Sequence, residues 1–541
     1  MINKISTNNQ DAYKKLQNAQ NASLNKNNNN PNFSGIPEIA GTVLGAATST
    51  LQFCNTNPMA GVSLIDMVTA IAPRTYVDAK TNGFAAAETF RRESSGLIVN
   101  CLIPGFIVLG VAKLLELFNK DNKGLAGMWA NQDALETLQD HFKESDKTAK
   151  GYVSRLFEDA KVLNGNKWVK LVPQELETEL TDYANVIENN VTDKKAIAQA
   201  RKNLYNKILE KTGGAEHIKI HGKVYHDNIS TLLRDTVDAG QKFIHDLGKD
   251  TSKIETFVKK ATKFVNKKSL FGLALVIPLA ASMQSINRWI TRKSSGQEGA
   301  PIYKDFGKGK HNDDMTPAQK SKFWTKKFAA AGLMVGTALL SMMKKPSLKM
   351  LQFTKNMPSM DQCRWIATST FASRMLASED ENELKEVTWR DIATFSSLYF
   401  LGDYVSKGVG TIIQKVKGVP LLNYMKDKPN NMNALQKFAY WVKDTKLKSF
   451  DEANAIKAAE STINGSKAKG LRAICELSSL GFSMLVLGIL VPWYVRKETE
   501  RKEQMKIKQK LKDLMTYPTL NLNSTSNKKT FQAFGMMLEK K

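Results

Sequence analysis

Four long stretches without a charged residue constrain this chain more than any other feature. Three of them hold nineteen residues each, at 94–112, 269–287 and 477–495, and the fourth, at 328–343, holds sixteen. A helix of nineteen residues is about 28 Å long, which is close to the hydrocarbon thickness of a lipid bilayer. Helices of a soluble core usually keep a polar stripe, and these stretches show little of one. The sequence therefore predicts about four membrane-spanning helices.

The sixteen-residue stretch at 328–343 is short for a span on its own. Lysine pairs stand on both sides of it, at 326–327 and 344–345. Their long side chains can reach the membrane interfaces from a short helix, which extends the stretch to a full span. Gly332 and Gly336 form a G-x-x-x-G pattern inside it, a weak indication of close helix pairing.

Prolines lie near the middle of two of these stretches. Pro104 and Pro278 lack an N–H and so free the carbonyls of Asn100 and Ala274, four residues earlier. Neighbouring helices can satisfy such a carbonyl in a membrane, so we interpret both prolines as packing kinks. The alternative is a broken helix that offers its carbonyls to an ion or solute. The lack of Asp, Glu, Lys, Arg and His in the four stretches favours the first interpretation.

The four stretches predict an all-α, multi-pass membrane protein. The N-terminus is polar and Asn-rich, which is typical of a disordered tail. Three weaker apolar stretches, at 39–53, 59–72 and 392–401, are further candidates for entering the membrane. In chain order we predict a disordered tail at 1–34, a membrane-proximal helical segment at 35–93, transmembrane helices at 94–112, 269–287, 328–343 and 477–495, helical extramembrane segments at 113–268 and 344–476, a basic loop at 288–327, and a basic tail at 496–541.

Positive charge sets the predicted orientation. The loop at 288–327 carries ten Lys and Arg residues and is the only short connection, and short basic loops stay in the cytoplasm. The tail at 496–541 is also basic, and with four spans it lies on the same side. We therefore expect a protein of the inner (cytoplasmic) membrane with both termini in the cytoplasm. A basic amphipathic pattern in the tail predicts contact with anionic lipid; a solvated stalk or a partner-binding helix is the alternative.

The net charge of +26 does not indicate a nucleic-acid partner. Arg supplies 14 of the 78 basic residues, and Lys the other 64. Arg is the residue that recognises bases and phosphates with two parallel hydrogen bonds, and no recognition motif accompanies the charge. We predict no nucleic-acid binding. The four cysteines lie far apart, which argues against a disulfide framework and against a cysteine zinc site.

Three histidines fall close together in the second half of the 113–268 segment. His217, His221 and His226 lie within one short stretch that predicts a β-hairpin turning near His221 and Gly222. Three imidazoles can bind Zn²⁺ or Ni²⁺. Ordinary exposed positions are the alternative, and we favour it because a hairpin does not obviously bring His226 to the other two.

No catalytic motif accompanies these features. Glu88 and Arg92 are four residues apart before the first span, which predicts a helical ion pair at the membrane surface, with an anion site as the alternative. The chain lacks the common nucleotide-binding, zinc-protease and serine-hydrolase motifs. We therefore predict no enzyme activity, no catalytic, metal-binding or cofactor-binding residue, and no cofactor.

Three stretches carry a resemblance to other proteins. APRTYVDAK, AAETFRRESSG and TWRDIATFSSLYFLGDY resemble segments of bacterial multi-pass membrane-associated proteins that have no assigned activity. The resemblance implies a bacterial membrane protein and adds no site residue. We expect an integral membrane protein with a structural, scaffolding or interaction role in the cell envelope. A small-solute or ion transporter, or a channel-like protein, is the alternative.

Overall fold

The computed structural model describes most of the chain between residues 45 and 508. Two compact units divide the sequence, at Met1–Ser49 and Thr50–Lys541, and every element named here belongs to the second. The predicted disordered tail at 1–34 lies outside the described residues, as does most of the tail at 496–541. The described residues are 45–54, 57–80, 83–225, 228–295, 316–342, 351–378, 381–429, 431–457 and 465–494, together with 497, 501, 504, 505 and 508.

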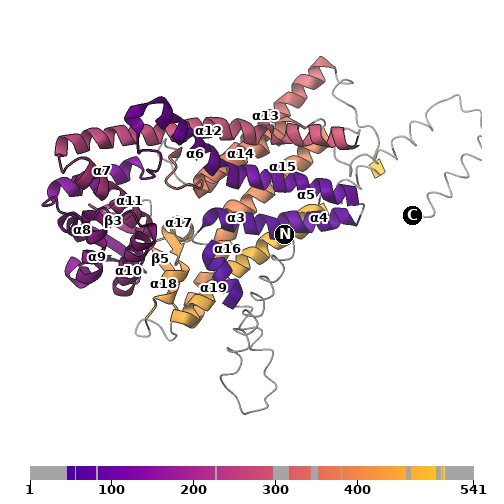
Figure 1. Ribbon diagram of the computed structural model, residues 1–541. Helices are drawn as coiled ribbons and strands as arrows, with labels where there is room; N and C mark the ends of the chain where they lie inside the picture. Colours follow the sequence, from indigo (N-terminus) through magenta and orange to yellow (C-terminus); the bar gives the residue numbers. More distant parts are fainter. Residues whose placement is uncertain are drawn as a thin grey trace, which may run out of the picture. The chain divides into compact units, whose positions relative to one another are not determined.

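Most of the second unit is helical, and its larger part is a helical bundle (Figure 1). Several of its long helices contain π-helical turns, which carry η labels, as do the short 3-10 helices η3 (Lys120–Asn122) and η4 (Pro173–Leu176) outside the bundle. The bundle consists of α3 (Pro58–Asp66), η1 (Met67–Ile71), α4 (Ala72–Ala79), α5 (Gly83–Leu97), η2 (Ile98–Leu102), α6 (Ile103–Phe118), α12 (Thr251–Ser295), α13 (Pro317–Met342), α14 (Met360–Leu376), α15 (Glu381–Ser396), η9 (Ser397–Leu401), α16 (Gly402–Lys417), α19 (Gly465–Ser483) and η10 (Met484–Leu490).

The remaining elements form an α/β body between α6 and α12, with a small addition before α19. Side chains of Asn131 and Asn228 cap two of its helices, each accepting a backbone N–H of the first turn. The elements are η3 (Lys120–Asn122), α7 (Gln132–Glu144), α8 (Ala149–Glu158), β1 (Ala160–Asn164), β2 (Lys167–Lys170), η4 (Pro173–Leu176), α9 (Glu177–Glu188), α10 (Lys194–Thr212), β3 (Ile218–Ile220), β4 (Lys223–Tyr225), α11 (Ile229–Gln241) and η5 (Lys242–Asp246), followed later by β5 (Leu422–Tyr424), α17 (Ala434–Asp444), β6 (Thr445–Leu447) and α18 (Phe450–Asn454).

Two small antiparallel sheets correct the all-α prediction, although the chain is mostly helical. One sheet has the strand order β2-β1-β3-β4, and β5 pairs with β6 in the other. The β3–β4 hairpin turns at His221 and Gly222, where the sequence predicts it, and both residues have positive φ, 50° and 73°. The β1–β2 hairpin turns after Asn164 at Gly165, whose φ is 62°. The two consecutive positive φ angles of His221 and Gly222 suit the tight turn of a two-residue hairpin.

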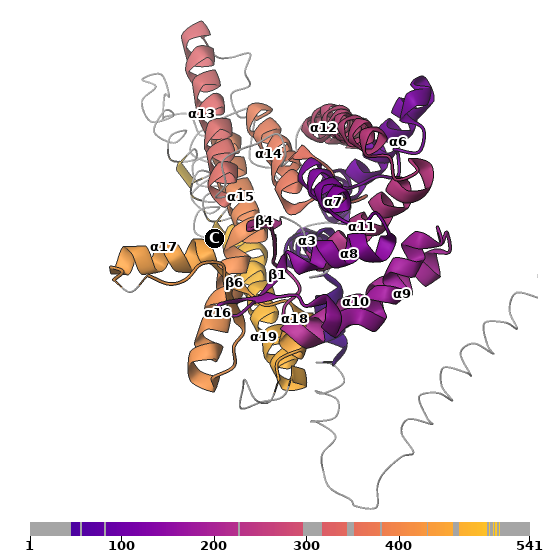
Figure 2. The same cartoon turned by 90° about the vertical axis from the view of Figure 1, so that its left-hand side faces the viewer.

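Helix α12 joins the α/β body to the bundle as one continuous helix of 45 residues (Figure 1). Near its start, Ile254 and Val258 belong to the core of the α/β body. Farther along, Leu273 and Val276 pack with α6 and α14 in the bundle. Figure 2, in which α12 is seen nearly end-on, shows α14 lying between α12 and α13. The same helix therefore belongs to two separate cores.

Among the described residues, three helices are long and apolar enough to cross a membrane, compared with about four predicted spans. They are Ala86–Phe118, Thr251–Ser294 and Gly465–Tyr494. The fourth predicted span lies in α13, which does not meet this standard because its uncharged part is short. Lys327 there is buried over the rings of Phe323 and Trp324, so its side chain does not reach out toward water.

The two predicted extramembrane segments contact each other directly. The Gly165 N–H of the first segment donates to Asn423 Oδ1 of the second at 2.9 Å. The Ala215 N–H donates to Glu452 Oε1 at 2.8 Å, and the two partners are 237 residues apart in sequence. These bonds join the α/β body and the β5–α18 region into a single structure at one end of the bundle.

The lack of a side chain at Gly105 lets α6 approach the backbone of Asn356, in the segment before α14, very closely. A Cβ atom added there would lie 2.4 Å from the Asn356 backbone oxygen, whereas Gly110, in the same helix, faces open space. Gly332 and Gly336 of the predicted pairing motif likewise face open space. Glycine therefore permits a close backbone contact in α6. In α13, no described residue makes such a contact through Gly332 or Gly336.

We expect Gly105→Ala to destabilise the bundle and Gly110→Ala to leave it unchanged or more stable. The first places a methyl group against a backbone carbonyl, for which overpacking costs about 1–3 kcal/mol. The second removes a glycine from an open helix position, which gains up to about 1 kcal/mol. Heat-induced unfolding of both variants in detergent measures the difference. Equal melting temperatures would contradict the contact between α6 and the chain at Asn356.

Candidate functional site

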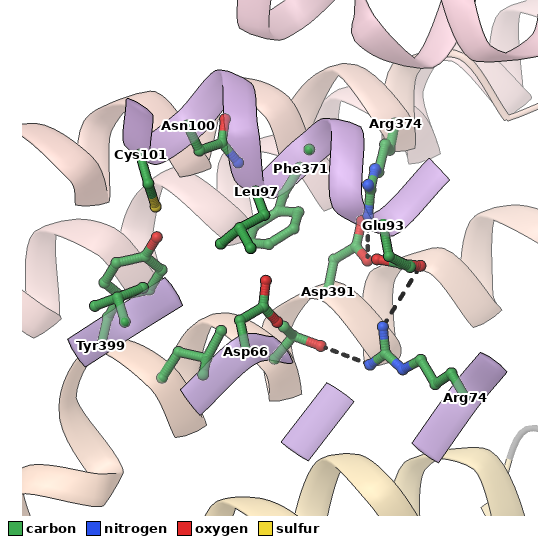
Figure 3. Close-up of a pocket in the computed structure, with 14 residues that line it drawn as sticks. Asp66, Arg74, Glu93, Leu97, Asn100, Cys101, Phe371, Arg374, Asp391 and Tyr399 are labelled. Carbon is green, nitrogen blue, oxygen red and sulfur yellow. Dashed lines mark hydrogen bonds and ion pairs between the residues drawn. The ribbon is translucent and has the colours of Figure 1, made fainter. Parts of the chain in front are cut away.

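Charged side chains from five helices meet inside the bundle (Figure 3). They are Asp66 of α3, Arg74 of α4, Glu93 of α5, Arg374 of α14 and Asp391 of α15, and all five line one small pocket. The last two are the most buried, with side chains 8% and 2% exposed. Charges are costly in such surroundings unless they are paired.

Opposite charges in this cluster are paired between helices. Arg74 Nη1 lies 3.6 Å from Glu93 Oε1, which joins α4 to α5. Arg374 Nη1 lies 3.5 Å from Asp391 Oδ1, which joins α14 to α15, and Arg390 Nε lies 3.2 Å from the same oxygen. The cluster therefore fixes the positions of four helices through ion pairs.

The pocket between these side chains has a volume of about 30 Å³. Its apolar lining includes Leu97 and Phe371. Asn100, Cys101 and Tyr399 also line it. A space of this size holds about one water molecule. The cluster therefore has no room for an organic solute in this conformation.

Neither Pro104 nor Pro278, the two prolines near the middle of predicted spans, interrupts its helix. Helix α12 continues through Pro278 from Thr251 to Ser295. Pro104 follows the π-helical turn η2 and frees the carbonyl of Asn100. The Asn100 carbonyl oxygen lies 3.8 Å from Cys363 Sγ of α14 and can accept a hydrogen bond from that thiol. This arrangement favours the packing interpretation of the prolines over an ion-binding one.

The predicted Glu88–Arg92 ion pair is not among the pairs formed by the described residues. Glu88 instead accepts a hydrogen bond from the Thr291 hydroxyl of α12 at 2.7 Å, and Arg91 donates to the same hydroxyl oxygen at 2.9 Å. Arg92 contacts Glu93. The reason is that α5 packs on α12, and Glu88, which is buried, turns toward that neighbour.

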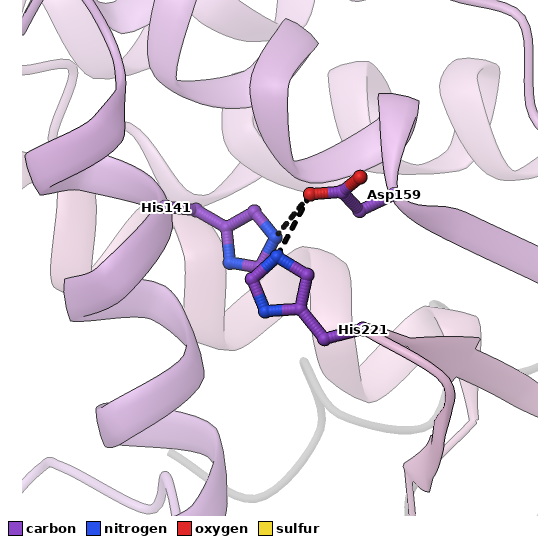
Figure 4. Close-up of side chains that lie close together, drawn as sticks. All are labelled: His141, Asp159 and His221. Carbon is purple, nitrogen blue, oxygen red and sulfur yellow. Dashed lines mark hydrogen bonds and ion pairs between the residues drawn. The ribbon is translucent and has the colours of Figure 1, made fainter.

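The three-histidine group that the sequence offers as an alternative cannot be followed in full, because His226 lies outside the described residues, but His221 joins another group. His221 stacks on His141 of α7, with ring centroids 4.3 Å apart, and both rings lie beside Asp159, which follows α8 (Figure 4). His217 belongs to no such group within the described ranges, and His226 lies outside them. Sequence reasoning missed His141 and Asp159 because they are 80 and 62 residues from His221 and share no motif with it.

A larger cavity of about 310 Å³ lies where the α/β body meets the β5–α18 region. Its lining includes Arg201, Tyr205, Glu216 and Asp451. Burial and the negative charge of Glu452 raise the pKa of Glu216 to about 7. The cavity is therefore polar, with basic and acidic groups on its wall.

No family model, curated protein or solved structure matches this sequence. Functional conclusions therefore rest on the geometry of the chain itself.

We expect Asp391→Asn to destabilise the bundle by about 3–5 kcal/mol, because it leaves buried arginine charge without its partner. Unfolding in detergent, induced by heat or by a denaturing detergent, measures the loss. Glu177→Gln is the matched control, since it breaks an exposed pair with Lys150 and such a pair contributes at most about 1 kcal/mol. An Asp391→Asn variant as stable as the control would show that the buried pair does not hold α14 to α15.

Proposed function

We propose that this chain is an integral membrane protein with a structural, scaffolding or interaction role in the bacterial cell envelope. The observation that supports this most is the continuity of α12. This helix of 45 residues begins in the core of the α/β body and continues into the bundle without a break. A rigid connection of this kind holds an extramembrane body at a fixed position relative to the membrane.

Large apolar side chains on the outer faces of the candidate spans support a lipid environment. Phe106 of α6 is 67% exposed, Leu275 of α12 is 56% exposed and Ile489 of η10 is 57% exposed. Exposed apolar surface over several helices is unfavourable in water and favourable in lipid. Trp289 and Trp493 are exposed near the C-terminal ends of two spans, where membrane proteins favour aromatic residues.

The contact between the two extramembrane segments supports a fourth crossing. Residues that hydrogen-bond across Gly165–Asn423 and Ala215–Glu452 lie on one side of any membrane that divides the bundle. Three spans alone would separate these segments, because only α12 would cross between them. A return crossing is needed between 296 and 417, and α13, with its uncharged stretch at 328–343, is the most apolar helix available there.

The distribution of charge supports an orientation for this arrangement. The predicted basic loop at 288–327 includes the end of α12 and the start of α13. Lys326 of α13 pairs with Glu381 at the same end of the bundle as the pair Arg288–Glu383. We propose that this end faces the cytoplasm, that both termini lie there, and that the basic tail contacts anionic lipid. The α/β body then lies on the opposite side of the inner membrane.

Solute or ion transport is the alternative function. The charge cluster of Asp66, Arg74, Glu93, Arg374 and Asp391 is the observation in its favour, because ionisable groups between membrane helices often serve transport. The pairing of Arg74 with Glu93 and of Arg374 with Asp391, together with the water-sized pocket, supports a structural role instead.

We expect two cysteine substitutions in α12 to label from opposite sides of the membrane. Ser252 and Ser294 are both exposed and 42 residues apart, which is about 63 Å along a helix and more than a bilayer with its headgroups. Both substitutions are made in a Cys54→Ser variant. A membrane-impermeant maleimide added to intact spheroplasts should label Ser252→Cys. Ser294→Cys should label only after permeabilisation.

Carbonate extraction of the same membranes is the companion measurement, and the protein should stay in the pellet. Recovery in the supernatant without detergent would contradict the membrane assignment. Labelling of both cysteines from the same side would contradict the crossing by α12. The opposite labelling pattern would retain the crossing and reverse the proposed orientation.

A further inference from the structure

We propose that His141, Asp159 and His221 form a binding site for a divalent transition-metal ion, with Zn²⁺ as the best match to the donor set. Each residue offers one ligand atom, and these atoms all lie within 4.8 Å of one another (Figure 4). Two imidazole nitrogens and one carboxylate oxygen are a common set of zinc ligands. The site lies wholly in the α/β body, so the proposal is independent of the membrane topology.

His141 is the member whose state the fold determines most firmly. Its side chain is fully buried, and its Nδ1 lies 2.7 Å from the Thr137 carbonyl oxygen. A carbonyl only accepts hydrogen bonds, so Nδ1 must carry the hydrogen, and in the neutral ring Nε2 then carries the lone pair. Metal-binding histidines are commonly held by just this kind of bond on the other ring nitrogen.

The second nitrogen of His141 has no hydrogen-bond partner among the described residues, although it is buried. It faces Asp159 Oδ2 at 3.4 Å and the ring of His221. A buried lone pair without a donor is unfavourable, and a metal ion would satisfy it. Burial also lowers the pKa of His141, which keeps the imidazole neutral and able to bind a cation near neutral pH.

Asp159 and His221 complete the set from two other elements. Asp159 Oδ2 lies 2.8 Å from His221 Nε2, and His221 stands at the tip of the β3–β4 hairpin with a side chain 40% exposed. Ligand atoms around a tetrahedral zinc ion lie about 3.3 Å apart, given zinc–ligand bonds of about 2.0–2.1 Å. A small shift of the exposed His221 ring therefore closes the site around an ion.

The guanidinium group of Arg155 already lies beside the Asp159 carboxylate. Arg155 Nη2 lies 3.4 Å from Asp159 Oδ2, but the same side chain also contacts Glu144 and Glu158. These two carboxylates offset the arginine charge, so Asp159 remains available to a metal ion. The exposed side of His221 leaves a fourth coordination position open to water or to a small anionic ligand, as in zinc sites with three protein ligands.

Cobalt binding by the full-length protein in detergent tests this proposal. Co²⁺ should give the visible absorption bands of a tetrahedral site at one equivalent, and Zn²⁺ should abolish them. Affinity for Zn²⁺, measured by competition with a chromophoric chelator, should fall about 10–100-fold or more in Asp159→Asn and in His221→Asn. Affinity should also fall as the pH is lowered, because protons compete with the metal ion for the ligand atoms.

His245→Gln is the matched control. Its Nε2 lies 2.9 Å from the Ile187 carbonyl oxygen in the same α/β body, outside the proposed site, and its zinc affinity should stay unchanged. His221→Asn keeps the fold testable, since the residue is at an exposed turn and Asn tolerates positive φ. Absence of tetrahedral bands, or equal zinc affinity in wild type, Asp159→Asn and His221→Asn, would overturn the proposal and leave a hydrogen-bonded histidine–aspartate group.

Discussion

The structure depends on one helix that lies in two different surroundings. The first part of α12 places Ile254, Val258 and Phe264 in the core of the α/β body. The later part packs Leu273 and Val276 against the bundle. Lys268 lies at the transition, fully buried, and its Nζ donates to the Met128 carbonyl oxygen and lies 3.9 Å from the Trp129 ring centroid. Because the helix is unbroken, the two cores cannot move independently.

Ion pairs inside the bundle supply the specificity that apolar packing lacks. Apolar helices in lipid have little preference for one neighbour over another, since lipid tails and leucine side chains are equally apolar. The pairs Arg74–Glu93 and Arg374–Asp391 each join two particular helices. Such pairs contribute little net stability, because burying the charges is costly, but a wrong arrangement would leave a charge unpaired. On this view the charge cluster selects the helix arrangement and has no need of a transported ligand.

Much of the fold can be read from local sequence, whereas the sites cannot. Uncharged stretches predict the three candidate spans, and the turn at His221–Gly222 predicts a hairpin, because both signals are contained in a few neighbouring residues. The β1–β2 hairpin has an equally local signal in its two turn residues, Gly165 and Asn166, which lie between the paired residues Asn164 and Lys167. Charge pairs such as Arg374–Asp391, and the approach of His141 to His221, depend on helix packing and strand pairing over long sequence distances. No residue spacing encodes them, so only the folded chain brings them together.

The central claim is that lipid, and neither water nor protein, covers the outer faces of the candidate spans. Spin labels at Leu275→Cys and Leu485→Cys, in the Cys54→Ser background and reconstituted in lipid nanodiscs, test it most directly, because both positions are exposed on different spans. We expect high collision rates with oxygen and low rates with a water-soluble nickel chelate, as lipid-facing positions require. High collision rates with the nickel chelate, or low rates with both reagents, would contradict it.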